Sequence, residues 1–507
     1  MKYSLGTRMK TRNRISRISV LFSVMSCGTI TSAETMAIFS LSHESLQWSS
    51  VPGTTNYVER STSLTGAWER LESGIAATNE RTEIGIQPAD FCFYRVASTV
   101  KFLDFTNSAN WEAYDASATD ALTTKGYSGG VFDGRFVYFV PNYNGRSPHA
   151  CVLRYDTQAA FTNSEAWAAH DANGTDGYAL GGFIGGAYDG RYVYFAPFIG
   201  FTPECILRYD TLGEFKSNAS WRVYDARPHD QFGIQGYMGA VYAQPFVYFI
   251  GFSNSGGTVL RHDAQADFND TNSWHSYIVG TASHGFHNYQ GASFDGRHLY
   301  LAPNLANNST KPESGLFVRF DTSLPFTNAS SWASFSYLST EGSNRFAYQG
   351  AVYDGRYVYF APDKRTNYME TKHGLALRYD TQFDFTNADG WASFDASATG
   401  GLDCNGYAGA AFDGRFVYYV PNGEPQENHG NALAYDTQKP FVDSNSWMAV
   451  SLTNLLGAGT AAFFGAVHDG TYLYYAPMKG SPAGRVVRFK TKMPSGIPGT
   501  ISGGSFF

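Results

Sequence analysis

Cysteine, charge and helix-forming residues are all scarce in this chain of 507 residues. It has 5 cysteines, only 16% of its residues are charged, and 9 methionines stand against 34 tyrosines and 53 glycines. The surplus of glycine and aromatic residues excludes an all-helical protein and favours many short strands joined by turns. With 43% hydrophobic residues, the chain is also not intrinsically disordered.

The N-terminus has the pattern of a secretory signal peptide. Lys and Arg are frequent before residue 18, residues 18–30 form an apolar run, and no acidic residue precedes Glu34. Small residues before Glu34 supply a cleavage site, so we expect residues 1–33 to be removed. Lipidation at Cys27 is the less favoured alternative, because the residues before it resemble a lipoprotein box poorly. The sequence therefore predicts a secreted, periplasmic or cell-surface protein.

The rest of the chain has no long hydrophobic run and an excess of acidic residues. No later segment is apolar enough to span a membrane, so we expect no transmembrane segment in the mature chain. Without the six cations of the leader, 31 basic residues face 44 acidic ones. This excess repels phosphate backbones and argues against nucleic acid as a partner. The four remaining cysteines are too few to staple a chain of this size, so packing must supply the stability.

Residues 34–100 differ from the later part of the chain and predict a small β-sandwich module. Short alternating strands are expected at 46–48, 57–60 and 91–96. The segment resembles a short fibronectin type III module, in which a tryptophan of one sheet packs beneath a tyrosine of the other. Trp48 and Tyr94 stand at those places. The resemblance implies a module that spaces or tethers its neighbour.

From residue 101 the chain repeats itself about seven times. Tryptophans recur at intervals of 53 to 59 residues: Trp111, Trp167, Trp221, Trp274, Trp332, Trp391 and Trp447. Within the repeats an Asp-Gly pair separates two apolar runs, which is the strongest short-range signal of a β-hairpin. It begins at Asp133, Asp189, Asp295, Asp354, Asp413 and Asp469. Each repeat therefore predicts four short strands.

Seven repeats of four strands predict an all-β protein, a seven-bladed β-propeller of four-stranded blades over residues 101–492. The array begins with a Trp strand at 111–115 and ends with an Arg strand at 485–491. We expect these two to share one blade. Pairing of both ends of the array then closes the ring and removes two exposed sheet edges. A tail follows at 493–507.

The repeated phrase resembles the kelch repeat. It has a hairpin turn, a Tyr-Val-Tyr type strand, a Tyr-Asp strand and a Trp strand, clearest from Tyr348 to Trp391. It departs from kelch where that family carries a glycine doublet after the second strand, since pairs such as Ala361-Pro362 stand here. The resemblance implies a fold, and kelch-type propellers include both partner-binding proteins and oxidases.

A repeat array offers a rule for sorting its residues. A residue found in every blade serves what every blade needs, whereas an asymmetric site should use residues found in one or two blades. By this rule the turn aspartates bond turn amides, the recurrent arginines join strands or blades, and the recurrent Trp and Tyr pack between blades. Function is then expected on the face of the variable loops, near the channel mouth.

Two sets of residues on that face are candidates. The first is a candidate metal site of His149, His373 and His429, which hold equivalent places in three blades, with His284 and His287 in another loop. Ordinary loop histidines are the favoured interpretation. Loop acids, Asp120, Asp176, Asp230, Glu341 and Asp403, offer a candidate Ca²⁺ ring, with a solvated rim favoured. We therefore expect no cofactor, and Ca²⁺ or a transition metal is the alternative.

The second set is aromatic and repeats near the channel mouth. Two residues before the inner-strand glycine stand Tyr127, Tyr237, Tyr289, Tyr348 and Tyr407, with Phe183 and Phe463 in the other two blades. These rings are candidates for stacking on sugars, although the completeness of the set favours packing. No nucleophile elbow, phosphate-binding loop, zinc-protease helix or signature of paired catalytic carboxylates occurs in the sequence.

The sequence favours a non-catalytic binding protein over an enzyme. Its ligand is expected to be a glycan or a cell-surface protein, bound on the variable-loop face of the propeller. One alternative is a metal-assisted polysaccharide lyase or glycoside hydrolase that uses the same face. The other is a structural protein of the envelope.

Overall fold

The computed structural model describes the seven N-terminal strands and most of the repeat array. In the array it describes residues 102–198, 204–229, 236–252, 257–279, 288–304, 316–337, 346–366, 370–422, 430–457, 460, 462–478 and 484–492. The expected signal peptide up to residue 32, the tail at 493–507, and His284, His287 and His429 lie outside the described residues.

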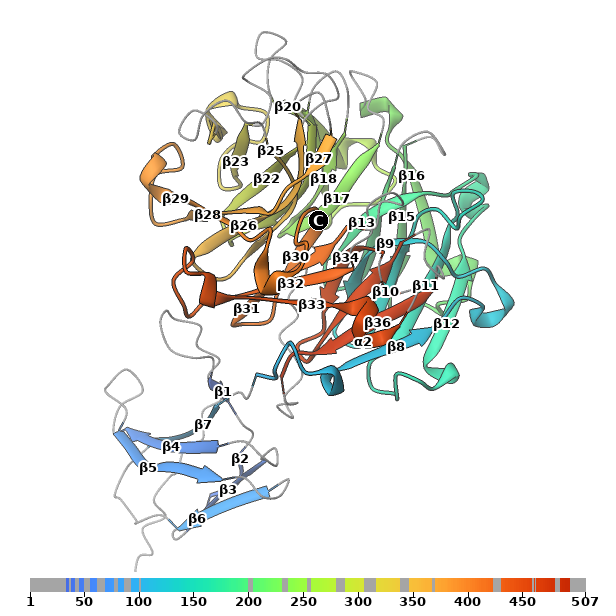
Figure 1. The fold of residues 1–507 in the computed structure, drawn as a ribbon. Coiled ribbons are helices and arrows are strands. Elements are labelled where there is room, and N and C mark those ends of the chain that lie inside the picture. Colours follow the sequence, from blue (N-terminus) through green and yellow to red (C-terminus); the bar gives the residue numbers. More distant parts are fainter. Residues whose placement is uncertain are drawn as a thin grey trace, which may run out of the picture. The chain divides into compact units, whose positions relative to one another are not determined.

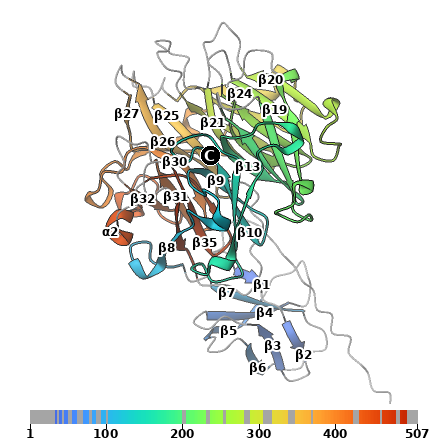
Figure 2. The ribbon, with the colours of Figure 1, turned by 90° about the vertical axis from the view of Figure 1, so that its right-hand side faces the viewer.

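The N-terminal strands form two antiparallel sheets (Figure 2). The four-stranded sheet has the order β1 (Ala33–Thr35), β7 (Phe93–Thr99), β4 (Thr55–Ser61), β5 (Glu69–Ala76). The three-stranded sheet has the order β2 (Ile38–Leu41), β3 (Ser45–Ser49), β6 (Arg81–Gly85). Val58 is fully buried. The side chains of Trp48 and Tyr94 lie outside the described part. This module and the array, residues 103–491, are separate compact units.

The array is a seven-bladed β-propeller of four-stranded antiparallel blades, which confirms the predicted fold (Figure 1). Blade 1 consists of β9 (Tyr127–Phe132), β10 (Phe136–Pro141), β11 (Cys151–Asp156) and β12 (Trp167–Asp171). Blade 2 consists of β13 (Phe183–Tyr188), β14 (Tyr192–Pro197), β15 (Cys205–Asp210) and β16 (Trp221–Asp225). Blade 3 consists of β17 (Tyr237–Ala243), β18 (Phe246–Gly251), β19 (Gly257–Asp263) and β20 (Trp274–Val279).

Blades 4 to 7 complete the ring. Blade 4 consists of β21 (Asn288–Phe294), β22 (His298–Asn304), β23 (Phe317–Asp321) and β24 (Trp332–Phe335). Blade 5 consists of β25 (Phe346–Tyr353), β26 (Tyr357–Thr366), β28 (Leu375–Asp380) and β29 (Trp391–Asp395), and the short strand β27 (Glu370–Lys372) pairs with β26. Blade 6 consists of β30 (Tyr407–Phe412), β31 (Phe416–Pro421), β32 (Asn431–Asp436) and β33 (Trp447–Ser451), and blade 7 consists of β34 (Phe463–His468), β35 (Tyr472–Pro477), β36 (Arg485–Lys490) and β8 (Trp111–Asp115).

The two ends of the array share blade 7, as the sequence predicted. Strand β8 supplies its outer strand and pairs with β36, with Trp111 opposite Phe489 and Tyr114 opposite Val486. Arg488 lies opposite Glu112 in the same register, and the two side chains form an ion pair of 2.5 Å. The ring is therefore closed by strands that lie more than 350 residues apart in the sequence.

Helical structure in the described residues is short. One-turn 3-10 helices precede the Trp strands: η1 (Ser108–Asn110), η3 (Ser164–Ala166), η5 (Asn218–Ser220), η7 (Thr271–Ser273), η8 (Ala329–Ser331), η9 (Ala388–Gly390) and η11 (Ser444–Ser446). Others lie between blades: η2 (Thr119–Ala121), η4 (Thr175–Gly177), η6 (Arg227–His229) and η10 (Thr399–Gly401), with the helix α2 (Leu452–Leu456). Each blade Trp donates its indole N–H to a phenylalanine carbonyl six residues earlier, at 2.9–3.1 Å.

The Asp-Gly turns are held by their own aspartate. In blade 2, Asp189 Oδ1 accepts the backbone N–H groups of Arg191 and Tyr192, and Oδ2 accepts the hydroxyl of Tyr194 at 2.8 Å. The arginine after the turn then forms an ion pair with the third-strand aspartate. Five blades have this pair at 2.7–2.8 Å: Arg135–Asp156, Arg191–Asp210, Arg297–Asp321, Arg356–Asp380 and Arg415–Asp436.

The third-strand arginines join neighbouring blades. The guanidinium of Arg208 lies 4.0 Å from the ring centre of Tyr192 in its own blade and 4.0 Å from that of Phe268 in the next blade. Arg154, Arg261, Arg378 and Arg488 are placed in the same way between two rings. Such cation–π contacts stabilise the blade interface. The repeated charges thus serve the fold, as their occurrence in most blades predicted.

Candidate functional site

The repeated aromatic residues lie in the interior. Tyr127, Tyr237, Tyr289, Tyr348 and Tyr407 are each no more than 2% exposed. The ring of Tyr127 meets the edge of Phe139 in its own blade and that of His149, with ring centres 6.0 and 5.7 Å apart. A sugar needs an exposed ring face for stacking, and these rings present none in this structure.

The two described histidines of the candidate metal set bond to the backbone. His149 Nε2 lies 3.1 Å from the carbonyl oxygen of Gly126, and its Nδ1 accepts the N–H of Cys151. His373 repeats this pattern. Its Nε2 lies 2.9 Å from the carbonyl oxygen of Ala347, and its Nδ1 accepts the N–H of Leu375 at 3.2 Å. Both ring nitrogens are thus engaged in a neutral imidazole, and burial lowers the pKa of His149.

Two of the loop acids cap the edge of the next outer strand. Asp120 Oδ2 accepts the N–H of Ala169 in β12 at 2.8 Å, and Asp176 Oδ2 accepts that of Val223 in β16 at 2.9 Å. Both residues have positive φ, near +50°. Within the described part of the chain, no three His, Cys, Asp or Glu side chains form a group that would hold a metal. No helix there is long and apolar enough to cross a membrane.

The three described cysteines are buried and free. Burial raises the pKa of the thiols of Cys151 and Cys205 to about 12 and that of Cys404 to about 11. A thiol with such a pKa carries almost no thiolate at neutral pH, which removes these residues from the candidates for a nucleophile.

Every inner strand carries a β-bulge that points one residue out of the sheet. In blade 2, Ile184 and Gly185 together face one residue of β14, because the register shifts between Phe183 and Gly186. The bulge glycine has a φ of +67° to +108°, a conformation that side chains disfavour, in all seven blades: Gly129, Gly185, Gly239, Gly291, Gly350, Gly409 and Gly465. The residue before this glycine does not have to be of one type, so its side chain can differ from blade to blade.

Four of the bulge residues meet at the centre of the ring. Ile184, Met238, Ala408 and Phe464 form one cluster although they come from blades 2, 3, 6 and 7, so they meet across the axis. The other blades place Ser128, Gln290 and Gln349 at this position. These residues were not among those predicted from the sequence. The sorting rule for repeats would have found them. Their position differs from blade to blade, whereas the aromatic residue before it and the glycine after it are present in all seven blades.

A second set of blade-specific residues follows the second strand on the variable-loop side. Phe198, Phe252 and Met478 pack against the apolar bulge cluster. The other blades carry Asn142, Asn304, Asp363 and Asn422 at this position. Blades 2, 3 and 7 supply apolar residues at both positions, blades 1, 4 and 5 supply polar ones, and blade 6 supplies one of each, Ala408 and Asn422. We refer to the residues of blades 2, 3 and 7 as the apolar side and to the polar residues of blades 4 to 6 as the polar side. We call the seven bulge residues and the seven residues that follow the second strands, taken together, the channel mouth.

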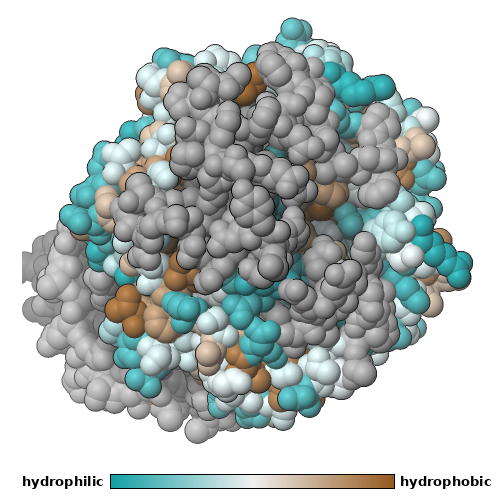
Figure 3. Space-filling model, turned by 45° about the horizontal axis from the view of Figure 1, so that its top comes forward, coloured by the Kyte–Doolittle hydropathy of each residue, from teal (hydrophilic) through white to brown (hydrophobic). Residues whose placement is uncertain are grey.

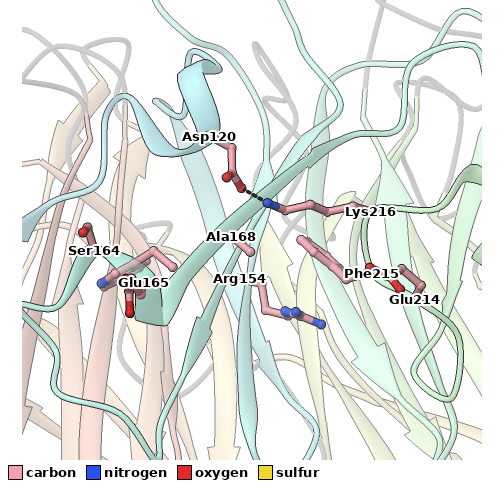
Figure 4. A pocket seen from close by; sticks show the side chains of 9 residues that line it. Asp120, Arg154, Ser164, Glu165, Ala168, Glu214, Phe215 and Lys216 are labelled. Atoms are coloured by element: carbon pink, nitrogen blue, oxygen red, sulfur yellow. Dashed lines mark ion pairs between the residues drawn. The ribbon is translucent and has the colours of Figure 1, made fainter.

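Described surface on one face of the molecule is mostly hydrophilic, with hydrophobic residues scattered among polar ones (Figure 3). A shallow groove lies elsewhere, at the outer edge between blades 1 and 2 (Figure 4). Asp120 and Lys216 point toward one another in it, and Lys216 Nζ lies 2.7 Å from Asp120 Oδ2. Arg154 in its wall packs on the ring of Phe215. The groove is thus built from contacts that join blades.

Comparison with known proteins finds only distant structural likenesses. No known family model and no curated protein sequence matches the chain. The chain is similar in structure to PorZ, a surface component of the type-IX secretion system of Porphyromonas gingivalis, with 11% identity and a TM-score of 0.41 over 77% of this chain. It spans 40% of the length of PorZ.

Two other solved structures are similar to the same degree. One is the outer coat vertex of COPII on membranes, with 8% identity and a TM-score of 0.44 over 78% of this chain and 90% of that chain. The other is a putative 6-phosphogluconolactonase from Bacteroides fragilis NCTC 9343, with 11% identity and a TM-score of 0.38 over 71% of this chain and 89% of that chain. At these values the likenesses carry no conclusion about this chain, and its own strand topology defines its class as a seven-bladed β-propeller.

Proposed function

We propose that the chain is an exported, non-catalytic binding protein that holds its ligand at the channel mouth on the variable-loop face. The observation that carries this proposal is the contrast between the framework, meaning the residues that repeat among the blades, and the channel mouth. Framework residues recur in most blades and bond to one another, whereas the channel mouth changes from blade to blade. Binding sites on repeat scaffolds have this property, because a ligand lacks the symmetry of the ring.

The ligand class we propose is a glycan or a cell-surface protein. The apolar residues Phe198, Phe252 and Met478 are half-buried at the channel mouth and offer contact area. The polar side of the mouth offers amide and carboxylate groups for hydrogen bonds. The kelch-like repeat and the predicted signal peptide are consistent with such a protein outside the cytoplasm. The fibronectin type III-like module would serve as its spacer or tether.

An enzyme with a histidine-held metal has less support. His149 and His373 already use both ring nitrogens on backbone groups of their own blades. A metal would have to break these bonds, and a buried N–H or carbonyl left without a partner costs free energy.

Glycan-array binding and metal analysis of the chain without its leader test the proposal. We expect binding that persists after dialysis against EDTA and no cleavage of polysaccharides. A stoichiometric transition metal that the change His373→Ala removes, together with loss of polysaccharide cleavage, would contradict the proposal and establish the enzyme. Phe252→Ala at the channel mouth should weaken binding, whereas Leu212→Ala, an exposed residue in a third-to-fourth-strand connection, should not.

A further inference from the structure

The polar side of the channel mouth contains three buried amide atoms that its own fold does not pair. These are Gln290 Oε1, Gln349 Nε2 and Asn422 Oδ1, and none has a hydrogen-bond partner among the described residues. Gln349 is 3% exposed and Asn422 is 2% exposed. Most buried polar groups in proteins are paired, so three unpaired amide atoms in neighbouring blades point to a ligand.

The amides are held in place by their surroundings. Asn422 Nδ2 in blade 6 donates to Asp363 Oδ1 in blade 5 at 3.2 Å, which fixes the amide so that its Oδ1 is the atom left over. Asp363 follows Pro362, which pairs with Tyr348, so Asp363 and Gln349 come from adjoining strands of blade 5. Gln290 has the bulge position of Gln349 in the neighbouring blade 4.

Among the described side chains, one acid and one base lie near these amides. Asp363 is 2% exposed and carries the carboxylate of this cluster. Lys372 is half-buried, and its Nζ lies 3.4 Å from the carbonyl oxygen of Asn422. Among the side chains that the structure describes beside these amides, one acid and one base leave no net charge for an anionic or cationic ligand to neutralise, and burying a further unpaired charge is costly.

The unpaired atoms offer both kinds of hydrogen bond. Gln290 Oε1 and Asn422 Oδ1 accept, and Gln349 Nε2 donates. A hydroxyl group both donates and accepts, so vicinal hydroxyls of one sugar ring match this mixture. The apolar side of the mouth, where the rings of Phe198 and Phe252 lie 6.1 Å apart, offers contact for the C–H face of the same ring. Gln290, Phe198 and Phe252 are only half-buried, so the mouth is partly accessible.

We infer that Gln290, Gln349 and Asn422 bind the hydroxyls of a neutral sugar residue at the channel mouth over blades 4 to 6. This inference rests on the proposed binding function and narrows its ligand to an uncharged glycan. An unpaired buried amide lowers stability in the free protein, and ligand hydroxyls satisfy it. The site therefore has two signatures, one in affinity and one in the stability of the free chain.

The test measures binding of neutral hexasaccharides of glucose, mannose, galactose and xylose to the full chain without its leader, by titration calorimetry. An oligogalacturonate serves as the anionic probe. We expect wild-type protein to bind at least one neutral hexasaccharide and to prefer it to the oligogalacturonate. Gln349→Met and Asn422→Leu should each weaken binding by about tenfold, the effect of losing a hydrogen bond to a ligand. Gln382→Met, which changes an exposed amide in a connecting turn, is the matched control and should bind as wild type.

Thermal unfolding of the free variants supplies the second readout. Gln349→Met should leave the melting temperature unchanged or raise it, because it removes an unpaired buried amide. A clearly lower melting temperature would mean that the amide is a structural group, and this overturns the inference. Preference for the oligogalacturonate, wild-type affinity in both variants, or failure of every neutral hexasaccharide to bind also overturns it. A different result would contradict the proposed non-catalytic function itself: a protein that holds a metal and cleaves polysaccharides.

Discussion

At the scale of single residues, the turn aspartate explains why tyrosine recurs in the second strand of the blades. Asp189, Asp354 and their equivalents accept a tyrosine hydroxyl on a carboxylate that already holds two backbone N–H groups. Blade 3 has Gln244 and Pro245 in place of the Asp-Gly turn. The hydroxyl of its Tyr248 is buried without a partner among the described residues.

This difference between blades predicts two opposite effects of the same substitution. Tyr194→Phe removes a hydrogen bond to a carboxylate and should lower the free energy of unfolding by about 1.5–3 kcal/mol. Tyr248→Phe removes an unpaired hydroxyl and should leave stability unchanged or raise it. Urea unfolding followed by tryptophan fluorescence measures both. Equal losses in the two variants would show that the hydroxyl of Tyr194 gains nothing from Asp189.

The Arg–Asp pairs predict the acid sensitivity of the fold. The hydrogen bond from Arg191 holds the pKa of Asp210 below its ordinary value. The unfolded chain therefore takes up the proton first, and the stability from this pair is present above about pH 4 and is lost as pH falls through the lower folded pKa. Asp210→Asn should be less stable at pH 7 and should lose less stability between about pH 4 and pH 2. Parallel stability curves for variant and wild type would contradict this.

The sequence was informative about these residues because their partners are local or recur with the repeat. The Asp-Gly turns, the Arg–Asp pairs and the packed tryptophans follow from that pattern. The amides at the channel mouth were not found, since only the bulge in the inner strand shows that Gln290 and Gln349 leave the sheet. A bulge depends on how two strands register, which one strand alone does not reveal.

At the scale of the strand and its connections, the loops between blades protect the outer edges. A strand at the edge of a sheet exposes N–H groups that would pair with another chain. Asp120 and Asp176 occupy such N–H groups on β12 and β16. The sequence predicted a solvated acidic rim, and for these two residues the structure shows a specific bond. The carboxylate reaches the next blade through a residue with positive φ, a tertiary feature that spacing does not encode.

Removing one of these caps should weaken the blade edge. Asp176→Ala frees the N–H of Val223 and should lower the free energy of unfolding by about 1 kcal/mol. It should also increase self-association at high concentration, because the edge of β16 becomes available for pairing. Thermal unfolding and light scattering measure the two effects. Glu165→Ala, a change to another exposed acid, should produce neither.

At the scale of the whole molecule, stability depends on the closing blade. Its outer strand β8 comes from the start of the array and its other strands come from the end. Glu112 and Arg488 pair across this junction, and Arg488 Nη1 also donates to the hydroxyl of Tyr155 in blade 1. The prediction of closure succeeded because an incomplete last repeat and an extra first strand are visible in the sequence.

Truncation tests the closure directly. A chain that starts at residue 103 keeps β8 and should unfold in one cooperative transition close to that of the full propeller. A chain that starts at residue 117 lacks β8 and exposes the edge of β36, so its melting temperature should fall and it should self-associate. Differential scanning calorimetry and sedimentation distinguish the two. Similar melting temperatures would show that the seventh blade is stable with three strands.

The bulge of the inner strands separates the residues that build the ring from the residues that we propose bind the ligand. Turn aspartates, interblade arginines and indole bonds all use other positions, and each bulge glycine supplies the required backbone conformation by itself. The side chains before these glycines can therefore be exchanged without loss of the framework bonds, although four of them, Ile184, Met238, Ala408 and Phe464, also pack on one another. A lineage that carried this ring would acquire new ligand specificities one substitution at a time, without first rebuilding the ring.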